Sequence, residues 1–134
     1  MTINITWVNS DQTVIKLEFP PVWTWNDLYD AKHRVEAMLD QADHDCAVLY
    51  ILPSNAKIPE NLLSNALRLL REGHARAKLS VVVTPSFFMR TMAELVRKIS
   101  ADVRNRSRIV ETIEQAHEAL IEAGFLTAQD RIET

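Results

Sequence analysis

The first twenty residues alternate between apolar and polar side chains, and this alternation predicts an antiparallel hairpin. Residues 9–12 are polar and separate two extended segments. The apolar face of these segments consists of Ile3, Ile5, Trp7, Ile15, Leu17 and Phe19. A period of two around a polar turn is typical of a hairpin that buries one side. We therefore expect Lys16 and Glu18 on the solvent side.

Four later segments have the helical period. The first helix is expected over about 25–42, with Thr24 as its N-cap and Asp27 near its positive end. A second helix is expected to start with Pro59 at its first position and to end near Gly73. Leucines 62, 63, 67, 69 and 70 give it a broad apolar face.

The third helix is expected to open at Thr84-Pro85-Ser86. Its predicted core face consists of Phe88, Met92, Leu95, Val96 and Ile99. The last helix is expected over about 113–123, where Thr112 and Gln115 have the spacing of a capping box and Gly124 provides the stop.

Three apolar runs between these helices, 46–52, 79–84 and 107–111, are expected to be strands. The order is then β-β-α-β-α-β-α-β-α, and helical crossovers between strands imply a mainly parallel sheet with the first strand antiparallel at an edge. The predicted fold class is α/β. We expect one domain over residues 1–126 and a loosely held tail over 127–134.

Composition narrows the range of functions. The 134 residues are 47% hydrophobic and 25% charged, with a net charge of −3, so no global positive field favours nucleic acid. We expect no membrane insertion and a cytoplasmic location, because neither a signal peptide nor an apolar run of about 20 residues is seen. Two glycines, Gly73 and Gly124, cannot form a phosphate-binding loop. The single Cys46 excludes an intramolecular disulfide and is expected to be a buried, unreactive thiol.

Several segments resemble a known family. They are Trp23–Leu28 at the start of the first helix, the strands 47–52 and 81–84, and the strand-to-helix segment Arg108–Leu120. With this element order, the chain resembles the anti-anti-sigma-factor-like superfamily (STAS, or SpoIIAA-like), and within it the small stand-alone bacterial members. The resemblance implies helices largely on one face of the sheet, and action through protein contacts rather than catalysis.

The regulatory members of that family carry a phosphorylated serine in an Asp-Ser-x-Gly segment at the start of the second helix. Here the corresponding residues 57–62 contain neither serine nor glycine. Ser54 is a displaced candidate for phosphorylation, although a serine in such a loop is more often a turn residue.

Other candidate residues point to contacts rather than to catalysis. Tryptophan is frequent at interface hot spots, so Trp23 and Trp25 are candidates either for packing or for a partner contact. A local excess of positive charge comes from Arg97, Lys98, Arg104 and Arg106. These side chains could bind an acidic partner, or they could complement the dipole at the C-terminus of a helix. Asp43-His44-Asp45 is interpreted as a turn rather than a metal site, and we expect no cofactor.

Three hypotheses remain open. The first is a non-catalytic interaction or regulatory module that binds a protein partner or self-associates as a homodimer. The face formed by Ser80, Val82 and Thr84 would then be available if helices covered only the other side of the sheet. The second is a carrier of a small apolar molecule or lipid held between a helix and the sheet, in a cavity lined by the leucine-rich second helix and by Met38, Met89 and Met92. The third is an enzyme of unrecognised type, for which the sequence shows no acid–base constellation.

Overall fold

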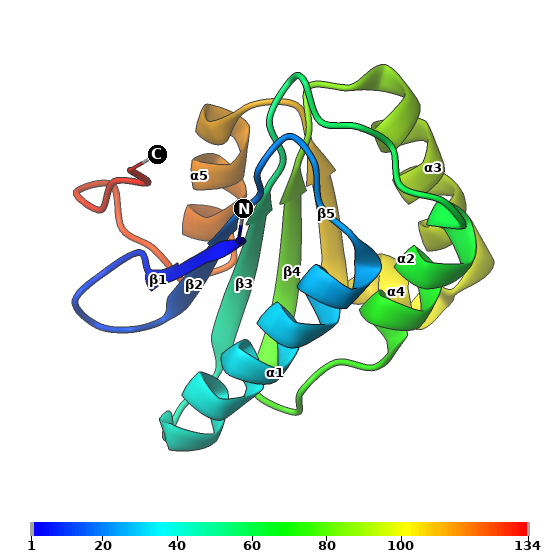
Figure 1. Cartoon of the computed structure of the whole chain (residues 1–134). Helices are drawn as coiled ribbons and strands as arrows, with labels where there is room; N and C mark the ends of the chain where they lie inside the picture. Colours follow the sequence, from blue (N-terminus) through cyan, green and yellow to red (C-terminus); the bar gives the residue numbers. More distant parts are fainter. Residues whose placement is uncertain (1, 134) are drawn as a thin grey trace.

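The computed structural model, which describes residues 2–133, contains one five-stranded sheet (Figure 1). Its strands, adjacent in chain order, are β1 (Asn4–Trp7), β2 (Val14–Glu18), β3 (Cys46–Ile51), β4 (Ala77–Val83) and β5 (Ser107–Val110). Strand β1 pairs antiparallel with β2, and all other pairs are parallel. The expected α/β class, the parallel sheet and the antiparallel edge strand are confirmed.

Within the described residues, five helices connect or follow the strands. They are α1 (Trp25–Gln41), α2 (Leu62–Arg71), α3 (Phe87–Ile99), α4 (Ala101–Arg106) and α5 (Ile113–Glu122). The capping boxes Thr24–Asp27 and Thr112–Gln115 form as the sequence predicts. The short helix α4 was not predicted. It begins directly after α3, because Ser100 ends one helix and caps the next through its side chain.

Helices cover both faces of the sheet, which corrects the expectation of a face left open. Helix α1 packs on the face that carries Ile15 and Val48, and α2 to α4 lie on the same side (Figure 1). Helix α5 packs on the opposite face, against Leu49 and Val81. The Ser80–Val82–Thr84 face lies beneath the α1–α4 side rather than in solvent.

Lys16 is buried, not solvated as the hairpin pattern predicts. It is 8% exposed, forms an ion pair with Glu18 at 2.7 Å, and donates a hydrogen bond to the carbonyl of Glu133. The cause is the C-terminal segment, which returns to this face of the sheet, where Ile132 packs with the α5 core. A single apolar residue in a polar tail gives no periodicity from which this packing can be predicted.

Two expectations about the α2–α3 region are wrong. Helix α2 begins at Leu62 and not at Pro59, because Asn61 adopts a left-handed conformation (φ 55°) that cannot continue a helix. In α3 only Val96 is buried. Phe88, Leu95 and Ile99, predicted to be in the core, are exposed.

Gly124 ends α5 in the left-handed conformation, and its replacement should be costly. Its φ is +86°. The N–H of Gly124 donates to the carbonyl of Ile121, and the N–H of Phe125 donates to the carbonyl of Leu120. These two hydrogen bonds form a Schellman motif. Gly124→Ala should lower the free energy of unfolding by about 1 kcal/mol through backbone strain, since a methyl group there would meet no atom within 4 Å. Urea denaturation measures this loss.

Gly73→Ala is the matched control, because Gly73 is not among the positive-φ residues. A methyl group at Gly73 would meet only the flexible end of Arg106, at 3.2 Å. Equal losses in the two variants would contradict the importance of the left-handed cap.

Candidate functional site

An apolar cavity of about 80 Å³ lies between the sheet, α2 and α3. It is at the carboxyl ends of the parallel strands, the edge at which open α/β sheets usually bind ligands. Its floor is formed by Tyr50, Leu52, Val82, Thr84 and Ile109. Its remaining walls are Phe19, Trp23, Trp25, Leu28, Leu62, Ala66, Leu69, Leu70, Met89, Met92 and Ala93.

Helix α2, which forms one wall of the cavity, has no buried residue. It packs against α3 and α4, and Leu69 reaches the core on this side of the sheet. Polar contacts link it to α1: the Tyr29 hydroxyl donates to Asn65 Oδ1 at 3.0 Å, and the Arg68 guanidinium lies 5.4 Å from the centre of the Tyr29 ring. Its N-terminus has no side-chain cap. Because none of its side chains is fully buried, α2 is the wall of the cavity that apolar packing fixes least.

Three aromatic residues form the end of the cavity next to the start of α1. Trp23 packs edge-to-face between Phe19 and Trp25, with ring centroids 5.1 Å away in each case. Prolines 20 and 21 end the extended segment after β2 and bring these rings together. Trp25 also donates its indole N–H to the carbonyl of Glu60 at 2.6 Å, which links α1 to the loop before α2.

The structure therefore brings the two predicted tryptophans into one site. Trp23 is 7% exposed and is a wall residue rather than an accessible anchor, whereas Trp25 is half-buried. The α2 leucines at 62, 69 and 70 line the cavity together with Met89 and Met92, whereas Met38, also expected there, packs against the core beneath α1. Phe19 and Thr84 were not singled out as site residues, because their place in the wall depends on the ends of strands and not on any motif.

The lining of the cavity has almost no acid–base chemistry. Among its residues only Tyr50 has an ionisable side chain, and burial raises the pKa of Tyr50 to about 12, against the opposing effect of its hydrogen bond with Ser80. Tyr50 is therefore protonated at neutral pH and cannot act as a base there. The site can bind an apolar group, but it offers no means of activating one.

A second, smaller cavity of about 40 Å³ lies beside the first and shares Tyr50, Leu69 and Leu70 with it. Several of its polar residues are paired, either with one another or with residues outside the lining. Lys32 lies 3.8 Å from Glu72, and the imidazole of His74 lies 2.7 Å from the carboxylate of Asp40. This pairing leaves the apolar cavity as the stronger ligand site.

The predicted basic residues are divided between paired and unpaired side chains. Arg97 contacts Glu94 at 2.9 Å, and Arg106 contacts Asp102 at 2.8 Å. Lys98 and Arg104 are exposed and form no ion pair within residues 2–133. The cluster is therefore mainly a set of local contacts at the ends of α3 and α4, with two cations facing solvent.

Ser54 lies exposed in the turn that follows β3, where the N–H of Ala56 donates to the carbonyl of Pro53. It stands apart from the start of α2, since residues 55–61 come between them. Phosphorylation of Ser54 stays a prediction, which the structure does not test.

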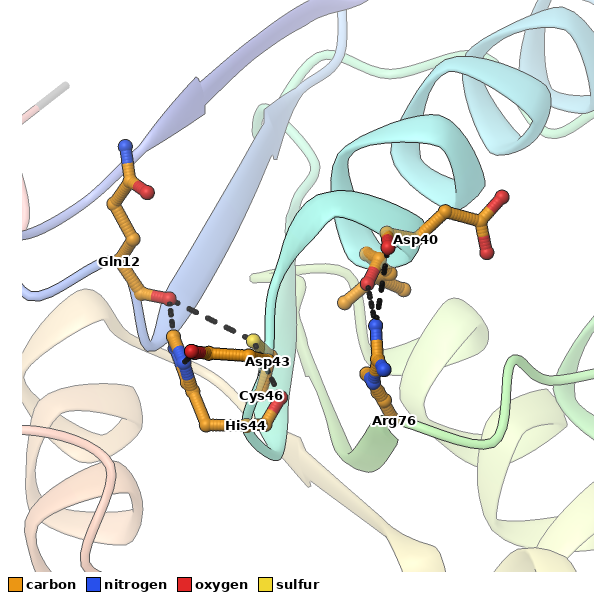
Figure 2. A network of polar contacts seen from close by, with 7 residues as sticks. Gln12, Asp40, Asp43, His44, Cys46 and Arg76 are labelled. Carbon is orange, nitrogen blue, oxygen red and sulfur yellow. Dashed lines mark hydrogen bonds and ion pairs between the residues drawn. The ribbon is translucent and has the colours of Figure 1, made fainter.

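The Asp43–Asp45 segment forms a structural link between two turns (Figure 2). His44 Nε2 donates to the carbonyl of Gln12 at 2.8 Å, while its Nδ1 lies 3.0 Å from the Asp43 carboxylate. Nearby, Arg76 donates to the carbonyls of Leu39 and Asp40 at the end of α1. Burial raises the pKa of the Cys46 thiol at the edge of this network, which keeps the thiol protonated and poorly nucleophilic.

Protonation of His44 should stabilise the fold. The Asp43 side chain first, and then the Gln12 carbonyl, raises the pKa of His44 above 6.5, because the imidazolium can donate to both acceptors. This stabilisation is fully present below pH 6.5 and is lost as the pH rises through the raised pKa. The melting temperature of the wild type should therefore exceed that of His44→Gln by more at pH 5.5 than at pH 8.5.

A titration of His44 followed by NMR checks the same effect directly. The pKa of Asp43 is lowered by its hydrogen bond with His44, so that carboxylate contributes above its ordinary pKa of 3.8 and loses its contribution only as the pH falls further. Both groups therefore contribute to the stability of the fold at pH values between 3.8 and the raised pKa of His44. A His44 pKa at or below 6.5 would contradict the proposed link.

Within residues 2–133, no cluster of three or more His, Cys, Asp or Glu side chains is placed to hold a metal ion. In the same part of the chain, no helix has both the length and the apolar character needed to cross a membrane. Comparisons of the chain with protein families, with curated proteins and with solved structures found no match.

Proposed function

We propose that this protein binds a small apolar molecule in the cavity between α2, α3 and the sheet, and acts as a carrier or sensor rather than as an enzyme. The observation that carries the proposal is the cavity itself, with its nearly complete apolar lining at the carboxyl ends of the strands. Enclosed apolar cavities stay dry and accept apolar ligands; one of about 150 Å³ binds benzene. The cavity described here is about 80 Å³ and is partly open to solvent, so it fits a small ring or a short branched chain that can extend through the open side.

The lining also supports a non-catalytic role. Its one ionisable group, Tyr50, is held protonated, and the side chains around it are apolar or neutral. The proposal agrees with the resemblance to the STAS-like superfamily, whose members act mostly without catalysis. The missing Asp-Ser-x-Gly segment favours ligand occupancy, rather than phosphorylation of α2, as the event to which this protein responds.

Cyclopentane is a suitable probe, and NMR of methyl-labelled protein is a suitable measurement. Saturable shifts are expected for the methyl groups of Met89 and Met92, which line the cavity. The methyl group of Ala116, buried on the α5 face, is the internal control and should not respond. Shifts that do not saturate, or equal shifts on both faces of the sheet, would overturn the proposal.

Self-association through α3 is a second candidate function, favoured by a separate observation. Phe87 is 76% exposed and Ile99 54% exposed, and together with Phe88 and Leu95 they place several large apolar side chains on one surface helix. Such contiguous apolar surface often marks an interface, and a second copy would bury it symmetrically. A concentration-dependent dimer in sedimentation equilibrium, lost in Phe87→Ser, is the expected result; a monomer at all concentrations would contradict it.

A further inference from the structure

Strand β5 forms one edge of the sheet, and the backbone of one of its residues has no hydrogen-bond partner. The N–H of Thr84 donates to the carbonyl of Val110 at 3.0 Å, in a register that pairs Val83 with Val110. Successive residues of a strand turn their backbone N–H and C=O groups to opposite sides, so those of Arg108 and Val110 face β4 and those of Ile109 face away. Within residues 2–133, no strand lies on that side and no hydrogen bond to the backbone of Ile109 is formed.

The edge positions on either side of Ile109 are already occupied by side chains. The carbonyl of Ser107 accepts a hydrogen bond from the Arg108 guanidinium at 2.8 Å. The N–H of Glu111 donates to Gln115 Oε1, also at 2.8 Å. Unpaired groups on an edge strand are a template for a strand from another chain, so Ile109 is the place at which a short strand can be added to this sheet.

A groove of about 350 Å³, open to solvent, lies between α3 and this edge. Ile109 lines it together with Phe87 and Leu95 of α3, whose side chains are 76% and 38% exposed. Helix α3 contacts β5 more extensively than β4 and lies on the β5 side of the sheet (Figure 1). A strand added beside β5 would therefore lie next to α3, and every second side chain of that strand would enter the groove.

The charges around the groove favour an acidic partner. The carboxylate of Glu94 lies 2.9 Å from the guanidinium of Arg97. The carboxylate of Glu111 lies 3.9 Å from the guanidinium of Arg90. These two carboxylates are thus offset by arginines. Within residues 2–133, three exposed cations at this edge form no ion pair: Lys98, Arg104 and Arg108.

We propose that this edge binds an extended segment of another protein in which apolar and acidic residues alternate. The alternation follows from β5 itself, because Ile109 lines the groove beside α3 whereas Arg108 lies on the α5 side of the sheet. Apolar side chains of the segment pack against Phe87 and Leu95, and its acidic side chains lie beside Arg108. Strand addition of this kind takes affinity from main-chain hydrogen bonds and specificity from alternate side chains.

A second copy of this chain is a poorer occupant of the edge. Pairing of two β5 strands would place the same cations, Lys98 and Arg108 among them, on both sides of the contact. Like charges across an interface disfavour association, whereas an acidic segment neutralises them. The inference is separate from the apolar ligand proposed above, whose binding is reported by Met89 and Met92.

The probe is a capped heptapeptide of alternating glutamate and valine, and its control has lysine in place of glutamate. In ¹H–¹⁵N spectra, the acidic peptide should move the amide resonance of Ile109 downfield in a saturable manner. The amide resonance of Val110, which faces β4, should move less. Strand β1 is the other edge of the sheet and should not respond. At low ionic strength the lysine peptide should bind at least about fivefold more weakly; equal binding would overturn the proposed acidic partner.

Two N-methylated forms of the acidic peptide test the backbone pairing. One form carries N-methyl groups on its valines, and the other carries them on its glutamates. Because alternate N–H groups of a strand point to opposite sides, only one of the two forms can donate hydrogen bonds to β5. That form should bind at least about fivefold more tightly than the other. Equal affinities of the two forms, or saturation without a shift of the Ile109 amide, would overturn strand addition.

Lys98→Glu tests the charge of the groove in the protein itself. Lys98 is exposed and lines the groove, so its reversal should weaken binding of the acidic peptide about threefold or more without unfolding the chain. Lys57→Glu is the matched control, because it makes the same change of charge on an exposed loop outside the groove, and it should leave the affinity unchanged. If the wild type is a dimer that the acidic peptide neither binds nor dissociates, a second copy covers the groove and the proposal is wrong.

Discussion

Leu120→Ala should lower the free energy of unfolding by about 2–5 kcal/mol, the range measured for fully buried leucines. Leu120 has no exposed surface, and it packs from α5 into the cluster that contains Ala47, Leu49 and Val81. The neighbouring side chains belong to a sheet and a helix that cannot collapse into the space left behind. Urea denaturation, with the slope unchanged between wild type and variant, measures this loss.

Leu69→Ala is the matched comparison on the other side of the sheet and should cost less than about 2 kcal/mol. Leu69 is only partly buried and already borders the cavity, so its side chain has fewer atoms to lose contact with. A larger loss for Leu120→Ala than for Leu69→Ala would reflect closer packing on the α5 face of the sheet than beneath α2. Equal losses in the two variants would show that α2 belongs to the rigid core and does not act as a cover.

The elements themselves could be predicted from sequence because their signals are local. The helix that begins after Thr24 and the one that begins after Thr112 both have a capping box, and each starts where the box places it. The strand pairing also follows from order, since hairpins join neighbouring strands and helical crossovers join parallel ones.

What lies against each face could not be predicted in the same way. The period of α3 identifies an apolar helix, but it does not show that Val96 would face inward while Leu95 and Ile99 face solvent. That choice depends on α2, α4 and β5, which α3 contacts after folding. Lys16 is a similar case, because its burial depends on residues more than one hundred positions away.

The cavity was the least predictable feature, because it is space that packing leaves empty. Trp23, Trp25 and the leucines of α2 were noticed as apolar or aromatic residues, and each has an ordinary role in packing. Only their arrangement around Thr84 and Tyr50 makes them a site. No residue type marks a void, so the carrier hypothesis could be stated from the sequence but not ranked first.

Ala66→Phe should abolish binding of cyclopentane, with at least about a tenfold loss of affinity because the added ring occupies the space that the probe needs. Ala66 lies on α2 and is one of the residues that line the cavity. Since the ring fills existing space, the free energy of unfolding should change by no more than about 1 kcal/mol. NMR titration and urea denaturation of the same sample measure the two effects together.

Ser64→Phe is the matched control, because it adds a ring to the exposed face of the same helix, away from the cavity lining. It should leave the affinity for cyclopentane unchanged, so that a loss confined to Ala66→Phe reports occupancy of the cavity rather than damage to α2. If Ala66→Phe kept its wild-type affinity while remaining folded, cyclopentane would be binding elsewhere, and the exposed apolar face of α3 would become the first place to search. If instead Ala66→Phe were destabilised by several kcal/mol, α2 would already be packed too closely on the sheet to admit a ligand.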